Sequence, residues 1–405
     1  MMRRTIGYAA VGLVAFSLGC EARSHVEAVS IQDSAGVEVV DNHTPEWTDA
    51  TRWHVAPGAS LRLGSAGGPV ETQFSEVVGA LRTPEGLLFV ADGASRQIRV
   101  FDRAGALHAV VGGAGDGPGE FRSLSALGVM EGKGVWAYDF LARRFTWLSL
   151  EAELLGTTTL PAEPPVLSAV GVLEGREPVL RQVWAATILA GAATAGFRRD
   201  PVAWVRFDAS AVTVDTLGVF PGREVTLTSD AGRLVMNLPP FVHTSEGAVR
   251  GTRIVVGTQD SLRFEELDRG GALTRQIRLP TPSLAVTPAA LEAELDRGVA
   301  TVPPEQRTAR RAALAALEHA ASQPAHARLL FDAEGNLWIE PFGLPVEGSA
   351  PWSVVDRTGR WLGRIDLPGG FRMLDAGAGE LIGVERDAFD VEEVVVYPLV
   401  KPSPR

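Results

Sequence analysis

The chain has 405 residues, 45% of them hydrophobic and 21% charged, which is the composition of a folded globular protein and excludes a disordered one. Its formal net charge of −11 argues against a nucleic-acid binder, because phosphate binding needs a positive surface. The only cysteine is Cys20, which excludes an intramolecular disulfide and a cysteine metal cluster.

The first twenty residues have the layout of an export signal. Arg3 and Arg4 precede a mostly apolar run at 6–18. This run is shorter than the roughly 20 residues of a stable membrane span, but it suits the apolar region of a signal peptide. Small Gly19 then precedes Cys20. We therefore expect an exported protein.

The end of this signal, Ser17-Leu18-Gly19-Cys20, resembles the lipobox of bacterial lipoproteins. The resemblance implies a signal peptide at 1–19, a lipidated Cys20 and a tether at 20–30. It also implies a membrane-anchored protein of the cell envelope, on the periplasmic side or the outer surface. An ordinary secretory signal with an incidental cysteine is the alternative.

Two stretches, 74–107 and 121–154, align without a gap at an offset of 47 residues. The identical pairs are Phe74 and Phe121, Asp92 and Asp139, Arg96 and Arg143, and Leu107 and Leu154. Both stretches consist of short runs rich in β-branched and aromatic residues, separated by turn residues. A period of roughly 40–50 residues with several strands per unit predicts the blades of a β-propeller.

We predict an all-β, six-bladed propeller in a single domain at 31–400, followed by a tail at 401–405. Five blades are expected near 77–111, 124–161, 166–220, 224–280 and 327–368. The sixth blade would combine 371–400 with the early segment 36–42, which would close the ring and leave no open edge. Seven blades are the alternative.

One segment, 287–323, departs from the β pattern. Thr287 can cap a helix with Pro288 at its first position, and a second helix follows Pro303-Pro304 and carries 309–321. We therefore predict a helical hairpin inserted between the fourth and fifth blades. It is either a solvated lid packed on one rim or a gate over one mouth of the central channel.

The glycine-rich stretch GAGDGPGEFR at 113–122 fits neither a phosphate-binding loop nor a dinucleotide-binding fingerprint. No Lys-Ser or Lys-Thr follows its glycines, and the next segment is strand-like. We predict a tight turn between blades, with Phe121 filling the space between them.

Residues 88–121, LFVADGASRQIRVFDRAGALHAVVGGAGDGPGEF, resemble an NHL-type repeat. The whole arrangement is similar to bacterial six-bladed β-propeller lipoproteins related to NHL proteins. The resemblance implies the fold and the envelope location. It carries over no catalytic motif.

Four repeat-equivalent residues are the candidate ligand contacts. Asp92 and Asp139 end a strand in their repeats, where they either accept backbone N–H bonds in the next turn or bind a cation at a channel mouth. Arg96 and Arg143 lie in the next turn, where they either pair with a neighbouring acid or bind an anionic ligand. No catalytic residue can be named, because no His-Glu-x-x-His or Gly-x-Ser-x-Gly motif occurs.

These features predict a tethered binding module of the envelope, which holds a protein, peptide or glycan on one face. We expect a monomer that contacts the membrane through its lipid and needs no cofactor. The alternative is a lactonase-like or lyase-like enzyme with a metal, such as Ca²⁺, in the central channel.

Overall fold

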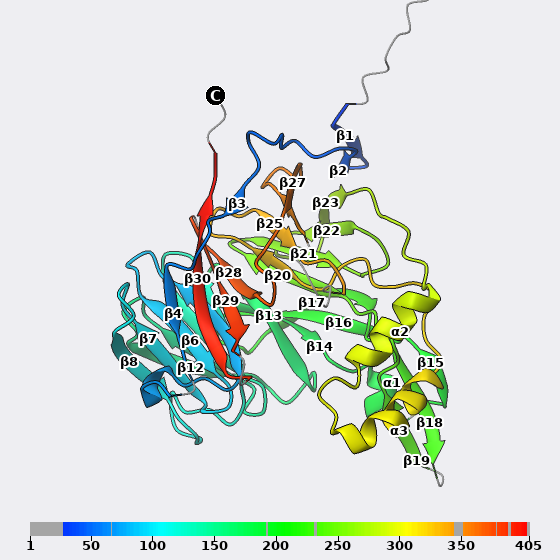
Figure 1. Ribbon diagram of the computed structural model, residues 1–405, viewed down its shortest axis with the longest axis horizontal. Coiled ribbons are helices and arrows are strands. Elements are labelled where there is room, and N and C mark those ends of the chain that lie inside the picture. The colour runs from blue at the N-terminus through cyan, green and yellow to red at the C-terminus, as the bar shows by residue number, and fades with distance from the viewer. Residues whose placement is uncertain are drawn as a thin grey trace, which may run out of the picture.

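The computed structural model describes residues 27–402, apart from 66, 192, 231–232, 344–350, 378 and 388–389. The predicted signal peptide and Cys20 lie outside these residues. In the described part, strands form six sheets that are arranged as the blades of a propeller, with a smaller sheet and the α-helices at one side (Figure 1). The predicted six-bladed fold is confirmed.

The first two blades are the aligned repeats, and the third follows them directly. Blade 1 contains β5 (Val77–Arg82), β6 (Leu88–Asp92), β7 (Gln97–Phe101) and β8 (Leu107–Gly112). Blade 2 contains β9 (Leu124–Met130), β10 (Gly134–Asp139), β11 (Arg144–Leu148) and β12 (Leu154–Thr159). Blade 3 contains β13 (Leu167–Leu173), β14 (Glu177–Gln182), β16 (Pro201–Phe207) and β17 (Val214–Pro221). In each blade the strands pair antiparallel in this order.

The other three blades follow the same order, and blades 4 and 6 also contain strands from the N-terminal segment. Blade 4 contains β20 (Glu246–Arg250), β21 (Arg253–Gly257), β22 (Arg263–Leu267) and β23 (Leu273–Arg278), extended by β2 (Val37–Asn42) and β1 (Val29–Ser34). Blade 5 contains β24 (Leu329–Phe331), β25 (Leu337–Ile339), β26 (Trp352–Val355) and β27 (Trp361–Ile365). Blade 6 contains β28 (Arg372–Ala376), β29 (Glu380–Arg386) and β30 (Glu392–Val400), with β4 (Leu61–Leu63) and β3 (His54–Val55).

The burial of each strand follows its sequence pattern. The second strand of blade 1, LFVAD, is buried throughout, because both of its faces pack against neighbouring blades. The outermost strands β8 and β12 alternate between exposed and partly buried residues, as expected for strands with one solvated face. Between every two neighbouring blades lies an apolar cluster, and the cluster of Leu63, Phe74, Phe101 and Val394 joins blade 6 to blade 1.

The first strands of the blades surround the axis and approach one another closely. A Cβ at Gly79 of β5 would lie 2.7 Å from the Cβ of Leu127 in β9. A Cβ at Gly171 of β13 would lie 2.6 Å from that of Val249 in β20. Glycine at these two positions lets the inner strands converge.

The predicted closure of the ring by 36–42 is wrong. This segment, β2, instead pairs parallel with β23 of blade 4, through Glu38 to Asp41. The strand that completes blade 6 is β4, which pairs antiparallel with β30 and buries Leu63 against the core. The early segment has the stronger β pattern, but the chain between the two strands is long enough to cross blade 5 before it reaches blade 6.

We call residues 29–63 the strap, because they run along the outer edges of blades 4, 5 and 6. Beyond β2, the backbone N–H groups of Glu46 and Trp47 donate to the carbonyls of Trp361 and Leu362 in blade 5. Asn42, only 5% exposed, donates to the carbonyls of Arg278 at 3.1 Å and Gly359 at 3.0 Å. These bonds tie blades 4 and 5 together through one segment.

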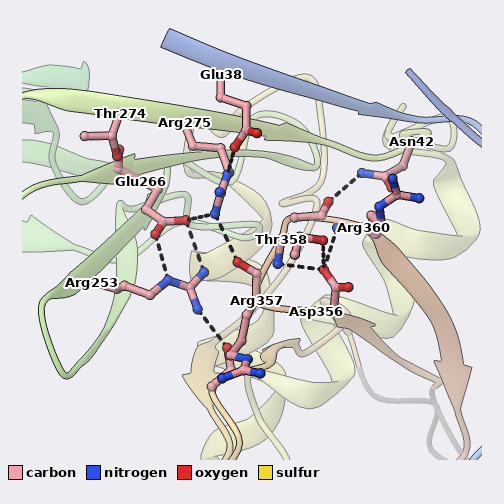
Figure 2. Close-up of polar contacts among 12 residues, drawn as sticks. Glu38, Asn42, Arg253, Glu266, Thr274, Arg275, Asp356, Arg357, Thr358 and Arg360 are labelled. Atoms are coloured by element: carbon pink, nitrogen blue, oxygen red, sulfur yellow. Dashed lines mark hydrogen bonds and ion pairs between the residues drawn. The ribbon is translucent and has the colours of Figure 1, made fainter. Parts of the chain in front are cut away.

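An ion-pair network joins the strap to blades 4 and 5 (Figure 2). The buried carboxylate of Glu266 accepts from Arg253 at 2.7 and 3.1 Å and from Arg275 at 3.1 Å. Arg275 also pairs with Glu38 of the strap and donates to the Arg357 carbonyl of blade 5. The fourth blade is thereby fixed to its neighbour by charge as well as by apolar packing.

The stretch 113–122 is a turn between blades 1 and 2, as predicted. The Phe121 N–H donates to the Gly113 carbonyl at 2.8 Å, and Glu120 accepts from the Gly117 N–H at 2.8 Å. The Phe121 ring is fully buried in the cluster between these two blades.

A small sheet and a helical hairpin project from the side of the propeller (Figure 1). The sheet contains β15 (Gly196–Arg198), β18 (Val225–Asp230) and β19 (Arg233–Asn237), next to the short α1 (Ala186–Leu189). Blade 4 therefore begins at Glu246, and the predicted start at 224 is wrong, because 225–237 pair in this extra sheet.

The hairpin of α2 (Pro288–Arg297) and α3 (Pro304–Ala315) confirms the insertion between blades 4 and 5. Thr287 caps α2 by accepting from the Ala290 N–H at 3.1 Å. The second helix ends at Ala315, earlier than predicted, and the chain then bonds to the extra sheet through the Thr226 hydroxyl and the Glu318 carbonyl at 2.9 Å.

Candidate functional site

A cavity of about 670 Å³ lies where five blades meet at the axis. Its lining comes from the ends of first strands and the turns that follow them: Leu81, Arg82, Thr83, Pro84, Val129, Glu131, Gly132, Arg250, Ala333, Asp375, Gly377, Gly379 and Glu380, together with Arg103 from the last turn of blade 1. A neighbouring hollow of about 310 Å³ shares Glu131, Arg250 and Ala333 with it and adds Glu174 of blade 3. We call the larger hollow the axial cavity.

The fold explains why charges gather here. The first strands of the blades lie side by side around the axis, so residues at their carboxyl ends meet at one mouth of the channel. Arg82 ends β5, Arg250 ends β20, and Glu131 directly follows β9. No residue of the helical hairpin lines the axial cavity, so the hairpin does not cover this mouth of the channel, and its role as a lid or as a gate stays a prediction.

Two ion pairs cross between blades in this cavity. Arg82 of blade 1 donates to Glu380 of blade 6 at 2.7 Å, with the arginine side chain only 9% exposed. Arg250 of blade 4 pairs with Glu131 of blade 2 at 2.6 Å. Four of the charged groups are thereby neutralised within the protein.

Asp375 is the acidic group that these pairs leave open. It lies at a β-bulge of β28, where the register shifts between Met373 and Asp375, and a bulge turns an extra side chain toward the cavity. Burial raises the pKa of its carboxyl to about 6, against the opposing effect of the Arg250 charge. The carboxyl of Asp375 therefore changes its protonation state around pH 6.

Arg103 is the basic group that the pairs leave open. It follows Asp102, whose Oδ1 accepts from the N–H groups of Ala104 and Ala106 at 2.9 Å and fixes the turn. The guanidinium lies over Gly86, where a Cβ would be 2.3 Å from the Arg103 Nε. Within the described residues, the Arg103 side chain forms no ion pair or hydrogen bond.

The predicted acids lie elsewhere. Asp92 and Asp139 end β6 and β10, the strands that run back from the axial cavity, and neither lines it. Asp139 is fully buried and accepts from the N–H groups of Arg122 at 2.6 Å, Ser123 at 3.1 Å and Ala142 at 2.9 Å. Asp92 accepts from the Glu76 N–H at 3.2 Å and the Ser95 hydroxyl at 2.8 Å. Both carboxylates therefore accept backbone N–H bonds and stabilise turns, which is the first of the two roles that the sequence left open for them.

The predicted arginines occupy the turns after these acids. Arg96 and Arg143 have left-handed backbone angles, with φ of 58° and 52°. Arg143 donates to the carbonyls of Pro161 at 3.1 Å and Pro164 at 2.9 Å, so it braces the chain between blades 2 and 3. A ligand-binding role for any of the four repeat-equivalent residues stays a prediction.

The sequence repeat does not predict the residues of the axial cavity, because aligned repeats compare equivalent positions and do not show which strand ends of different blades meet. One signal was available: Glu131-Gly132 and Glu174-Gly175 follow the similar strand ends GVM and GVL. The bulge that turns Asp375 inward has no such signature in the sequence.

In the part of the chain that the structure describes, no three His, Cys, Asp or Glu side chains are grouped to hold a metal ion. Ca²⁺ needs six to eight oxygen ligands, and Glu131 and Glu380 of the axial cavity are already bonded to arginines. These residues therefore do not fit the metal centre of the enzyme alternative. Among the described helices, none is long and apolar enough to cross a membrane.

Comparisons with known proteins agree with the fold. Residues 70–174, about a quarter of the chain, match the family DUF5128, described as a 6-bladed beta-propeller. No curated protein matches. The chain is similar to a member of the DUF4221 family from Bacteroides vulgatus, with 9% identity, a TM-score of 0.51, and 87% of this chain and 100% of that chain covered.

Two further solved structures show weaker similarity. A candidate exported protein from Bacteroides fragilis is 12% identical with a TM-score of 0.48, and 89% of this chain and 99% of that chain are covered. Virginiamycin B lyase from Staphylococcus aureus is 10% identical with a TM-score of 0.41, and 86% of this chain and 99% of that chain are covered. At these identities the similarity concerns the fold alone.

Proposed function

We propose that this chain is a membrane-tethered binding module of the bacterial cell envelope, which binds a protein, peptide or glycan at its axial cavity. One observation carries the proposal: side chains from five blades converge on a cavity of about 670 Å³ that contains both paired and open charges. A cavity of this size with a few convergent polar groups is typical of a ligand site.

The test is photo-crosslinking in intact cells that produce the protein. A photoreactive residue at Pro84, an exposed position of the cavity mouth, is compared with one at Val212, which is 80% exposed on the blade 3 rim. We expect a mass adduct on the peptide that contains position 84 and none on the control. Equal adducts at both positions, or none at 84, would contradict binding at this mouth.

The tether is tested separately through Cys20. Replacing Cys20 by serine removes the thiol that would carry the lipid, while the apolar run at 6–18 still directs export. We expect the wild type in the membrane fraction and the variant in the soluble envelope fraction. Equal partition of both proteins would leave the ordinary secretory signal as the explanation.

An enzyme that uses the same cavity is the second candidate. The observation in its favour is Asp375, because a carboxyl with a pKa of about 6 suits proton transfer near neutral pH. The test is hydrolysis of a lactone panel by the purified protein, with and without added Ca²⁺ or Zn²⁺. Turnover that disappears in Asp375→Asn would establish the enzyme, and no turnover under any condition rejects it for this class of substrates.

A further inference from the structure

We infer that the ligand of the axial cavity carries one ammonium and one carboxylate, as a short peptide with free ends does. The ammonium would lie at Asp375 and the carboxylate at Arg103. This inference rests on the proposed function and narrows its ligand to one chemical class.

The charges of the cavity lining point to such a ligand. Three arginines (Arg82, Arg103 and Arg250) and three acids (Glu131, Asp375 and Glu380) line the axial cavity. Two arginines and two acids neutralise each other in the ion pairs between blades. One open acid and one open base remain, so a ligand with one charge of each sign leaves every charged group paired. A ligand without a positive charge would leave the partly buried Asp375 carboxylate unpaired, which costs free energy, whereas the exposed Arg103 stays hydrated and gains a charge-assisted bond when a carboxylate binds.

Asp375 suits an ammonium group. The charged groups that face it are Arg250 from β20, Glu380 from β29 and Asp332 after β24. Arg250 is neutralised by Glu131 and Glu380 by Arg82. The carboxylate of Asp332 is occupied by the Asn336 amide at 2.8 Å and the Trp338 indole at 3.0 Å. A single open carboxylate can hold an ammonium through a charge-assisted hydrogen bond, whereas a divalent metal needs several oxygen ligands.

Arg103 suits a carboxylate. Its guanidinium presents a planar fork of N–H donors, which matches the two oxygens of a carboxylate. The backbone of its turn is fixed by Asp102, and the side chain lies along Gly86 at the edge of the cavity. The turn therefore holds the backbone of Arg103 at the edge of the cavity, while its exposed side chain still loses rotamer freedom when a carboxylate binds.

This arrangement couples binding to a proton. A bound ammonium stabilises the ionised form of Asp375 and lowers the pKa of its carboxyl from about 6, so binding near pH 6 releases a fraction of a proton. Affinity should rise with pH from about 5 to about 7 and then level off.

The experiment uses the full mature protein, solubilised in detergent, and three probes: a random tripeptide mixture with free ends, the same mixture N-acetylated, and the same mixture C-amidated. The concentration dependence of the melting temperature gives an apparent Kd for each. We expect the free mixture to bind, and each blocked mixture to bind about tenfold or more weakly, as loss of a hydrogen-bonded charge pair implies.

Variants assign each end of the peptide to its partner. Asp375→Asn should weaken binding of the free mixture about tenfold, remove the effect of acetylation and abolish proton release at pH 6, measured by calorimetry in two buffers of different ionisation enthalpy. Arg103→Gln should remove the effect of amidation instead. The matched controls are Asp49→Asn, at a fully exposed acid, and Arg310→Gln on the exposed face of α3; both should bind like the wild type.

Two results would overturn the inference and leave the proposed function intact. The first is a crosslinked adduct at Pro84 without any shift of the melting temperature by the free mixture. The second is binding of the free mixture that neither blocking nor the two variants changes. Absence of an adduct at Pro84 would instead reject the axial cavity as the binding site.

Discussion

Asp375 lowers the stability of the folded chain near neutral pH. Its carboxyl has a higher pKa in the folded chain than in the unfolded chain, so the folded state holds more protons between about pH 4 and pH 6. The unfolding free energy therefore falls as pH rises through this window. Residues that destabilise a fold in this way are typical of functional sites.

Asp375→Asn is predicted to raise stability at pH 7.5 by roughly 1–2 kcal/mol and to leave it nearly unchanged at pH 4, where the wild-type carboxyl is protonated. Urea unfolding at the two pH values measures this. Equal effects of the substitution at both pH values would show that the ionised carboxylate is not the destabilising group.

His326 has the opposite pH dependence. It is fully buried, and burial lowers the pKa of its ring to about 4, with the His243 charge acting in the same direction and the Asp260 charge against it. The ring is harder to protonate in the folded chain than in the unfolded chain. The contribution of His326 to the unfolding free energy is therefore fully present above pH 6.5 and is lost as pH falls toward 4.

His326→Leu should therefore reduce the stability difference between pH 7.5 and pH 4.5 by about 2 kcal/mol, whatever its effect at neutral pH. The exposed His108→Gln is the control and should leave this difference unchanged. Identical pH profiles for His326→Leu and the wild type would contradict the buried neutral ring.

At the scale of elements, one buried acid holds two arginines together where the strap meets blades 4 and 5. Glu266 is 7% exposed and neutralises both Arg253 and Arg275 (Figure 2). A buried ion pair adds little over an apolar contact of equal volume, but removing one partner leaves the other charge uncompensated.

Glu266→Gln is predicted to destabilise the protein by about 2–4 kcal/mol, because the partly buried Arg253 loses the carboxylate that neutralises it and Arg275 is left with Glu38 alone. Thermal unfolding measures the change, and the neighbouring Glu265→Gln, for which no ion pair is present in the described residues, should stay within about 0.5 kcal/mol of the wild type. A similar small loss for both variants would mean that the Arg253 and Arg275 charges are solvated.

At the scale of the whole molecule, the ring is closed by packing and by the strap. The apolar cluster between blades 6 and 1 includes Leu63 of β4, and β4 covers the edge of β30 at 394–396. The rest of the strap adds bonds to blades 4 and 5 without closing the ring. The two parts of the strap should therefore differ in their effect on folding.

Removing the chain up to residue 52, which deletes β1 and β2, is predicted to give a folded protein with a lower melting temperature. Removing it up to residue 63 exposes the edge of β30 and opens the core, so aggregation is expected. Size-exclusion chromatography and circular dichroism distinguish these outcomes. A soluble, cooperatively unfolding product from the longer deletion would show that β4 is dispensable for closure.

The sequence by itself determined the repeat, the propeller fold, the buried turn at Phe121 and the start of α2 at Thr287, and it favoured six blades over seven. Each depends on patterns that are local or recur at a fixed offset: strand periodicity, turn residues and a capping residue. The contacts of Asp92 and Asp139 belong to the same class, because each carboxylate bonds to backbone groups of its own repeat.

Only the tertiary structure decided which blade each N-terminal strand joins and which charges meet at the axis. The β pattern of 36–42 is compatible with any open edge, and the path of the chain across blade 5 selects the partner. Arg82, Glu131, Arg250 and Asp375 lie in four different blades and share no motif, because a ring brings together strand ends that are far apart in the chain. Their proximity depends on the closure of the whole ring, which no local pattern encodes.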